Sequence, residues 1–199
     1  MPASATSRGV FVDLQKVGTS LAQVWEIRTK QLRDSRGFFL ETYHREKFAE
    51  LGITDTFVQD NQSCSRKGVV RGLHYQLHHA QAKLVRVTEG EALDVAVDIR
   101  FGSPQFGKWA SVVLSAEAQN QLYIPAGFAH GFLAMSENVK LLYKCGDFYS
   151  AGDEHGILWN DPSLGIAWNV VKPIISEKDA KLPTLASVTE AWLPRYPAK

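Results

Sequence analysis

Hydrophobic and polar residues alternate in short segments along most of this chain. Apolar residues recur at every second position over about four to eight residues, which is the period of a β-strand with one buried face. Turns rich in glycine and proline separate these segments, among them Glu89-Gly90, Gly102-Ser103-Pro104 and Pro125-Ala126-Gly127. The pattern predicts strands over residues 23–27, 38–42, 56–59, 69–76, 83–88, 92–99, 109–114, 121–124 and 140–144. Many short strands with regular turns favour an all-β sandwich or barrel over a parallel α/β sheet.

Helical signals are confined to two places. Residues 45–51 carry a helical pattern that ends at Gly52, and a second short helix is expected to begin at Ser176. No internal repeat divides the chain. We therefore predict a single domain over residues 1–199, with N-terminal strands over about 24–60, a barrel core over about 60–150 and a C-terminal helical segment over about 176–199.

The composition excludes several classes of partner. The chain has 199 residues, of which 45% are hydrophobic and 22% are charged, as in an ordinary globular protein. The 22 basic and 21 acidic residues leave a net charge of +1, so no nucleic acid is expected as a partner. No apolar run is long enough to span a membrane, and residues 1–9 lack the apolar core of a signal peptide. Cys64 and Cys145 have neither the spacing of a disulfide framework nor that of a zinc site, so we expect a reduced, cytoplasmic protein.

One predicted strand carries an ionisable side chain inside an apolar run. In the segment 68–76, strict alternation places Arg71 on one face with Leu73 and Tyr75, and His74 on the other face with Gly72 and Gln76. An isolated histidine of this kind is commonly a core residue bonded to a backbone carbonyl. A second histidine elsewhere in the chain favours a chemical role instead.

That second histidine is His130, in a Pro-x-Gly-x-x-His turn over residues 125–130. The turn resembles the second half of the cupin signature, which implies a double-stranded β-helix, a jelly-roll barrel with a few short helices. Metal-binding cupins supply His-x-His in the first half, but here Gln76 follows His74, and His78 and His79 fall in a predicted loop. Two histidines and a glutamine are a poor ligand set for a first-row metal, so we expect no metal.

Seven motifs occur in the order seen in one family, over residues 34–41, 57–61, 71–76, 83–87, 94–100, 127–132 and 159–162. The chain closely resembles the dTDP-4-dehydrorhamnose 3,5-epimerases over about residues 24–182. The resemblance implies a cofactor-free enzyme of dTDP-L-rhamnose synthesis that acts on a dTDP-sugar nucleotide. It would convert dTDP-4-dehydro-6-deoxy-D-glucose to dTDP-4-dehydro-L-rhamnose.

The family's chemistry accounts for the residue types. A 4-keto sugar has acidic C–H bonds at C3 and C5, because loss of either proton gives an enolate. The resemblance implies that His74 is the base, since a neutral imidazole accepts a proton near neutral pH. It implies that Asp179 orients His74, that Tyr143 reprotonates the carbon from the opposite side, and that Lys83 stabilises the enolate oxygen.

Each of these residues also has a purely structural interpretation. Asp179 would cap the C-terminal helix, Tyr143 would be a half-buried strand aromatic, Lys83 a solvated edge charge and His130 a turn residue. Register with the family favours the catalytic interpretation of the first three, and we expect His130 to contact the substrate.

The resemblance also implies residues for the nucleotide half of the substrate. Cations are expected at the pyrophosphate, polar and aromatic contacts at the nucleotide, and a third group reaching across the interface of a homodimer. The cations at the pyrophosphate are Arg71 and Lys178, and the contacts to the nucleotide are Gln59, Asn61 and Tyr149. The group that reaches across the dimer interface is Arg36, Phe39 and Glu41. Leu32 and Ala82 depart from the family's usual phenylalanine and glycine, which bears on fine substrate preference.

Three alternative functions remain open. A close variant would invert only C3 or only C5 of another dTDP-deoxysugar. A metal-dependent cupin would use His74 and His130 together with His78 or His79. A third alternative is a barrel that binds a sugar nucleotide without catalysis.

Overall fold

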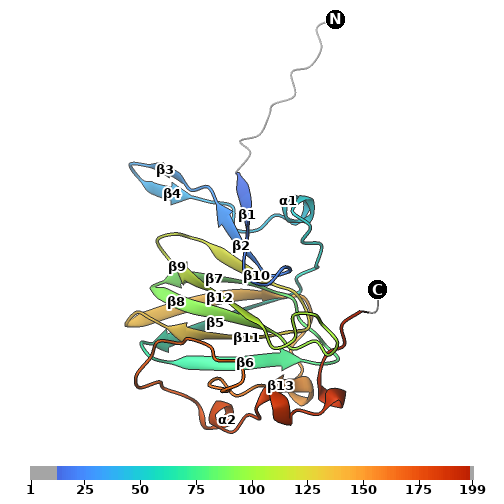
Figure 1. The fold of residues 1–199 in the computed structure, drawn as a ribbon. Helices are drawn as coiled ribbons and strands as arrows, with labels where there is room; N and C mark the ends of the chain where they lie inside the picture. Colours follow the sequence, from blue (N-terminus) through green and yellow to red (C-terminus); the bar gives the residue numbers. More distant parts are fainter. Residues whose placement is uncertain (1–12, 198–199) are drawn as a thin grey trace, which may run out of the picture.

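A computed structural model describes residues 13–197, and these residues form two antiparallel β-sheets packed face to face (Figure 1). The six-stranded sheet has the order β1 (Leu14–Gly18), β2 (Trp25–Thr29), β10 (Gln121–Ile124), β7 (Lys83–Glu89), β12 (Asn138–Cys145) and β5 (Gln59–Arg66). The five-stranded sheet has the order β13 (Glu154–Gly156), β6 (Val70–Gln76), β11 (Phe128–Ala134), β8 (Glu91–Asp98) and β9 (Trp109–Ser115). Strands that are neighbours in space are mostly distant in sequence, as in a jelly roll, so the predicted all-β barrel is confirmed.

The main core lies between the two sheets. Val85 and Val87 of β7 and Leu141 of β12 are fully buried in it, and they pack with Ala96 of β8 and Phe132 of β11 from the other sheet. Their spacing at every second residue explains why the strand pattern was readable from the sequence. Toward one end of this interior the side chains become polar, and a cavity opens there.

Helices and loops cover the outer faces of both sheets. Helix α1 (Arg45–Glu50) places the buried Phe48 against Leu84 and Tyr123 on the outside of the six-stranded sheet. The C-terminal segment packs Ile157 and Trp168 against the outside of the five-stranded sheet. This segment holds α2 (Glu177–Ala180) and the 3-10 helices η2 (Leu185–Ser187) and η3 (Glu190–Trp192), while η1 (Ala151–Asp153) precedes β13. Within residues 13–197 no helix is long and apolar enough to cross a membrane.

Several strand predictions were wrong: the strand expected over 23–27 is β2, which is shifted by two residues, and β1, β3, β11 and β13 were not among the predicted strands. The strand expected over residues 56–59 is instead β5, which begins at Gln59 and continues to Arg66. Its sequence is almost entirely polar: Ser63 lines the cavity, Gln59 and Asn61 are only partly buried, and the alternate residues are exposed. The strand expected over 38–42 is limited to β4 (Gly37–Phe39), which pairs with β3 (Leu32–Asp34) in a hairpin that extends away from both sheets (Figure 1). The first nine residues, examined for a signal peptide, lie outside the described residues.

Candidate active site

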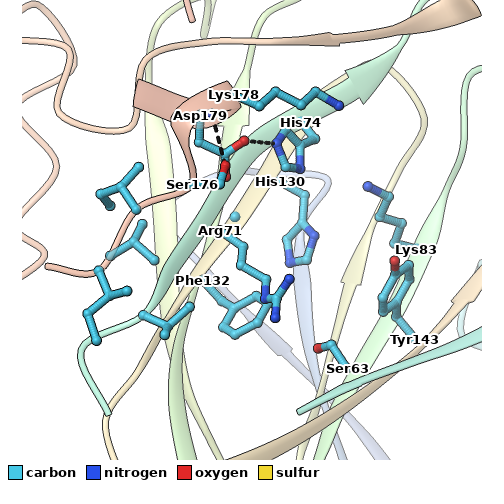
Figure 2. Close-up of a pocket in the computed structure, with 15 residues that line it drawn as sticks. Ser63, Arg71, His74, Lys83, His130, Phe132, Tyr143, Ser176, Lys178 and Asp179 are labelled. Atoms are coloured by element: carbon cyan, nitrogen blue, oxygen red, sulfur yellow. Dashed lines mark hydrogen bonds and ion pairs between the residues drawn. The ribbon is translucent and has the colours of Figure 1, made fainter. Parts of the chain in front are cut away.

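A cavity of about 530 Å³ opens between the two sheets and contains most of the predicted catalytic residues (Figure 2). His74 and His130 reach it from the five-stranded sheet, and Lys83 and Tyr143 reach it from the six-stranded sheet. The remaining lining residues come from β5, from β6 and the residue before it, from β11, from residues 174–176 and from α2. They are Ser63, Val69, Val70, Arg71, Gly131, Phe132, Ile174, Ile175, Ser176, Lys178 and Asp179.

A β-bulge brings Arg71 and His74 to the same cavity. On β11, His130 pairs with His74 and Phe132 pairs with Arg71, so two residues of β6 oppose the single residue Gly131. The extra residue reverses the alternation, and the prediction that Arg71 and His74 lie on opposite faces was therefore wrong. Gly72 within the bulge has a φ of 111°, and a Cβ atom there would lie 2.6 Å from the His130 carbonyl oxygen. Only glycine fits that position.

His74 is held by a carboxylate from α2. Its Nε2 lies 2.7 Å from Asp179 Oδ1, and the backbone N–H of Gly72 donates to Asp179 Oδ2 at 3.2 Å. Burial raises the pKa of Asp179, but hydrogen bonds from His74, Gly72 and Ser176 outweigh it and hold that pKa below its usual value. The ionised carboxylate only accepts hydrogen bonds, so His74 carries its proton on Nε2 and turns the lone pair of Nδ1 toward the cavity.

The capping interpretation of Asp179 was wrong. The N-cap of α2 is Ser176, whose hydroxyl accepts a hydrogen bond from the Asp179 backbone N–H at 3.0 Å. The cap leaves the carboxylate of Asp179 free to point away from the helix toward His74, as Figure 2 shows.

A second histidine–aspartate pair lies beside the first. His130 Nε2 is 2.9 Å from Asp94 Oδ1, and the Asp94 side chain is fully buried on β8. Asp94 was not among the site residues predicted from the sequence. Its signal was a carboxylate inside the apolar strand over residues 92–99, where a buried charge requires a partner. The partner fixes the ring of His130, which is 7% exposed and lines the cavity.

Lys83 and Tyr143 lie on neighbouring strands across the cavity from His74. The Lys83 Nζ atom is 6.0 Å from the centre of the Tyr143 ring. Burial lowers the pKa of Lys83, and among the described residues no carboxylate forms an ion pair with it. Burial raises the pKa of Tyr143, so its phenol stays protonated at neutral pH.

The cavity mouth carries a cluster of charged and polar groups. The Lys178 ammonium pairs with the Glu154 carboxylate, and the Tyr149 hydroxyl donates to the same Glu154 oxygen at 2.9 Å. Glu154 was not predicted from the sequence, because its partners Lys178 and Tyr149 come close to it only in the folded chain. Gln59 Nε2 donates to Asn61 Oδ1 at 3.0 Å, and Gln59 Oε1 accepts from the Tyr149 backbone N–H at 2.9 Å. Lys178 lines the cavity, whereas Glu154, Tyr149, Gln59 and Asn61 do not.

Three predicted residues are not brought to the cavity of their own chain. Arg36 forms an ion pair with Asp34 at 2.6 Å within the β3–β4 hairpin. Phe39 in the same hairpin is 66% exposed. Glu41 accepts a hydrogen bond from Lys47 at 2.7 Å.

The donor set of a metal-binding cupin does not converge here. Within residues 13–197 no group of three or more histidine, cysteine or carboxylate side chains is arranged to hold a metal ion. The Gln76 amide is bonded to backbone groups of His79, Phe148 and Ser150. His79 pairs with Asp147 at 3.3 Å, outside the cavity.

Comparison with known proteins identifies the family. The family model described as dTDP-4-dehydrorhamnose 3,5-epimerase matches residues 18–187. A Shigella flexneri dTDP-4-dehydrorhamnose 3,5-epimerase is 52% identical over 165 residues, which make up 82% of this chain and 91% of that protein. A Neisseria gonorrhoeae protein of the same name is 47% identical over 184 residues, which make up 92% of this chain and 56% of that longer protein.

A solved structure supports the same assignment. The Legionella pneumophila dTDP-6-deoxy-D-glucose-3,5-epimerase, in complex with dTDP-4-keto-L-rhamnose, superposes with a TM-score of 0.91 at 46% identity. The match covers 94% of this chain and 100% of the other. The family predicted from the seven motifs is therefore confirmed: this chain belongs to the dTDP-4-dehydrorhamnose 3,5-epimerase family.

Proposed function

We propose that this cavity epimerises C3 and C5 of dTDP-4-dehydro-6-deoxy-D-glucose, giving dTDP-4-dehydro-L-rhamnose in dTDP-L-rhamnose synthesis. One observation carries the proposal. A base oriented by a carboxylate, His74, and a protonated phenol, Tyr143, enter one cavity from opposite sheets. Inversion at carbon requires removal of a proton on one face of the sugar and delivery of a proton on the other.

In the first step, Nδ1 of His74 takes the proton from the carbon next to the C4 ketone. The electron pair of the broken C–H bond moves into the ring, and the ketone oxygen becomes an enolate oxygen. The imidazolium formed at His74 is stabilised by Asp179, whose lowered pKa keeps it ionised at neutral pH.

In the second step, Tyr143 donates its phenolic proton to the opposite face of the same carbon, and the ketone re-forms. We assign the Lys83 ammonium to the enolate oxygen, because it lies near Tyr143 and has no carboxylate partner among residues 13–197 that would neutralise it. Proton exchange with solvent restores His74 and Tyr143, and the sequence repeats at the second carbon. We assign His130, fixed by Asp94, to a contact with the sugar.

The nucleotide half of the substrate is assigned to the mouth of the cavity. Arg71 and Lys178 line the cavity with exposed side chains, as contacts to a diphosphate require. Tyr149 is 54% exposed and is available to stack on thymine. Gln59 and Asn61 are its polar neighbours on β5.

A second copy of the chain completes this proposal. The β3–β4 hairpin extends away from its own sheets and exposes Phe38 and Phe39 (Figure 1). We propose that the chain forms a homodimer in which this hairpin and Glu41 reach the nucleotide site of the partner subunit. Covering the exposed rings then stabilises the dimer.

The proton transfers by His74 and Tyr143, with Lys83 at the enolate oxygen, need no cofactor. We propose a cytoplasmic location, because both cysteines are free thiols and Cys145 is buried in the sheet.

Incubation with dTDP-4-dehydro-6-deoxy-D-glucose in D₂O tests the function. We expect deuterium at both C3 and C5 and the inverted product by NMR. Deuterium at one carbon alone would establish a single epimerisation instead, and deuterium at neither would refute both. Stoichiometric iron, zinc or manganese that is required for turnover would establish the metal-dependent alternative. A His74→Ala variant that matches the wild type in turnover would contradict the assignment of the base.

A further inference from the structure

Gln76, the last residue of β6, has a buried amide whose polar atoms are all bonded to backbone groups. The residue is 5% exposed. Its Nε2 donates to the carbonyl oxygens of His79 at 2.7 Å and Phe148 at 3.1 Å. Its Oε1 accepts from the backbone N–H of Ser150 at 2.7 Å. One side chain thus joins the strand of His74 to two separate loops.

The bonds of Gln76 lie on both sides of Tyr149. Phe148 and Ser150 are the chain neighbours of Tyr149, and the backbone N–H of Tyr149 itself donates to Gln59 Oε1. Two glutamines from different sheets therefore fix the two peptide groups on either side of the Tyr149 Cα atom. The ring of Tyr149 stays 54% exposed above this fixed backbone. A flat ligand that stacks on an exposed ring binds better when the ring is held in place beforehand.

The loop over residues 77–82 is tied to the same region. Asp153 is 6% exposed and accepts hydrogen bonds from the backbone N–H groups of His78 at 2.9 Å and His79 at 2.7 Å. Gln76 bonds the carbonyl of His79, so Asp153 and Gln76 hold the two sides of one turn. Without the Gln76 amide, two backbone carbonyls and one N–H lose their partner, which releases both loops.

We propose that Gln76 is a positioning residue for recognition of the nucleotide base, acting through the loop that carries Tyr149. The inference rests on the proposed function, since it assumes that Tyr149 stacks on the base. Gln76 stands at the position that supplies the second histidine of the His-x-His metal ligands in a metal-binding cupin. Here that position serves binding of the nucleotide, while its neighbour His74 serves proton transfer.

Two variants and one matched control test the proposal in the full chain. Gln76→Met removes all three hydrogen bonds at similar volume, and Gln76→Glu keeps the acceptor but turns a carboxylate oxygen toward two carbonyls. Gln62→Met is the control, because Gln62 is an exposed residue on β5. We expect both Gln76 variants to bind dTDP about tenfold more weakly by calorimetry. We expect kcat at saturating substrate to stay within about twofold of the wild type.

A double-mutant cycle separates positioning from a general loss of structure. Tyr149→Ala alone is expected to weaken dTDP binding about tenfold. If Gln76 acts through Tyr149, adding Gln76→Met weakens binding by no more than about twofold further. The proposal is overturned if the losses of affinity in the two single variants multiply in the double variant. It is also overturned if both Gln76 variants bind dTDP as tightly as the wild type, or if their kcat falls as much as their kcat/KM. Wild-type protein that binds no dTDP would instead refute the proposed function itself.

Discussion

Replacing Asp179 with asparagine removes the charge behind His74 while keeping the shape of the side chain. The amide oxygen of Asn still accepts the backbone N–H of Gly72, which Asp179 accepts at 3.2 Å. The amide nitrogen, however, donates toward His74 Nε2, where Asp179 accepts at 2.7 Å. His74 then carries its proton on Nδ1, and the nitrogen that faces the cavity has no lone pair for the C–H proton.

The size of the effect follows from the geometry of the pair. An opposite charge at about 4 Å in a partly buried site, with an effective dielectric of about 20, is worth about 4 kcal/mol. The Asp179 side chain is 6% exposed, so solvent screens the interaction weakly. Loss of this stabilisation of the imidazolium lowers kcat/KM by about 10³-fold. The changed tautomer of His74 also lowers kcat/KM.

The assay is deuterium incorporation at C3 and C5 of the sugar, followed by ¹H NMR under kcat/KM conditions. Glu177→Gln is the matched control, because Glu177 is on the same helix with a side chain that is 96% exposed. We expect the control to match the wild type and both variants to unfold at similar temperatures. An Asp179→Asn enzyme that keeps more than about a tenth of the wild-type rate would refute the assigned role of the pair.

Three further predictions concern the cavity, the bulge and acid stability. Lys83→Met is expected to lower kcat about 10²-fold or more with little change in dTDP affinity, measured by steady-state kinetics and calorimetry. Gly72→Ala is expected to lower the free energy of unfolding in urea by about 3 kcal/mol or more, because its Cβ meets a carbonyl oxygen at 2.6 Å, whereas Gly18→Ala, with no atom within 4 Å, is expected to be nearly neutral. Hydrogen bonds outweigh burial and hold the pKa values of Asp161 and Asp179 below their unfolded value near ~3.9. The contribution of these two carboxylates to the free energy of unfolding is therefore complete above about pH 4, and it is lost as the pH falls through their folded-state pKa values. Urea unfolding between about pH 6 and pH 3 measures this loss.

The sequence predicted most of the strands whose buried face is apolar, although β11, which is buried on both faces, was not among them. Val85 and Val87, for example, alternate with outward residues, so β7 was placed correctly from its pattern. Strand β5 was misplaced, because its partly buried face carries Gln59, Asn61 and Ser63, of which Ser63 lines the cavity, and so has no hydrophobic period. Strand patterns report burial against apolar groups, and they fail where the function requires a polar lining.

The candidate site was predicted in part, and the reason is distance along the chain. His74 and Asp179 are 105 residues apart, so only the family resemblance suggested the pair. Asp94 and Glu154 were missed because their partners His130 and Lys178 become neighbours only in the folded chain.

Arg71 was placed on the wrong face of β6, because the alternation of residues along the sequence does not reveal a β-bulge. The roles of the site residues and the single-domain boundaries remain predictions.

His74 and Tyr143 act on opposite faces of the sugar from opposite walls of the cavity. The stereochemistry of the reaction in a Tyr143→Phe variant is the sharpest test of this arrangement. The variant is incubated with dTDP-4-dehydro-6-deoxy-D-glucose in D₂O, and both deuterium content and configuration at C3 and C5 are measured by NMR. His74 still removes protons in this variant and returns deuterons to the face that it took them from. We expect deuterium exchange with retained configuration at both carbons. Inversion at the wild-type rate, or loss of exchange and inversion in equal measure, would contradict this arrangement.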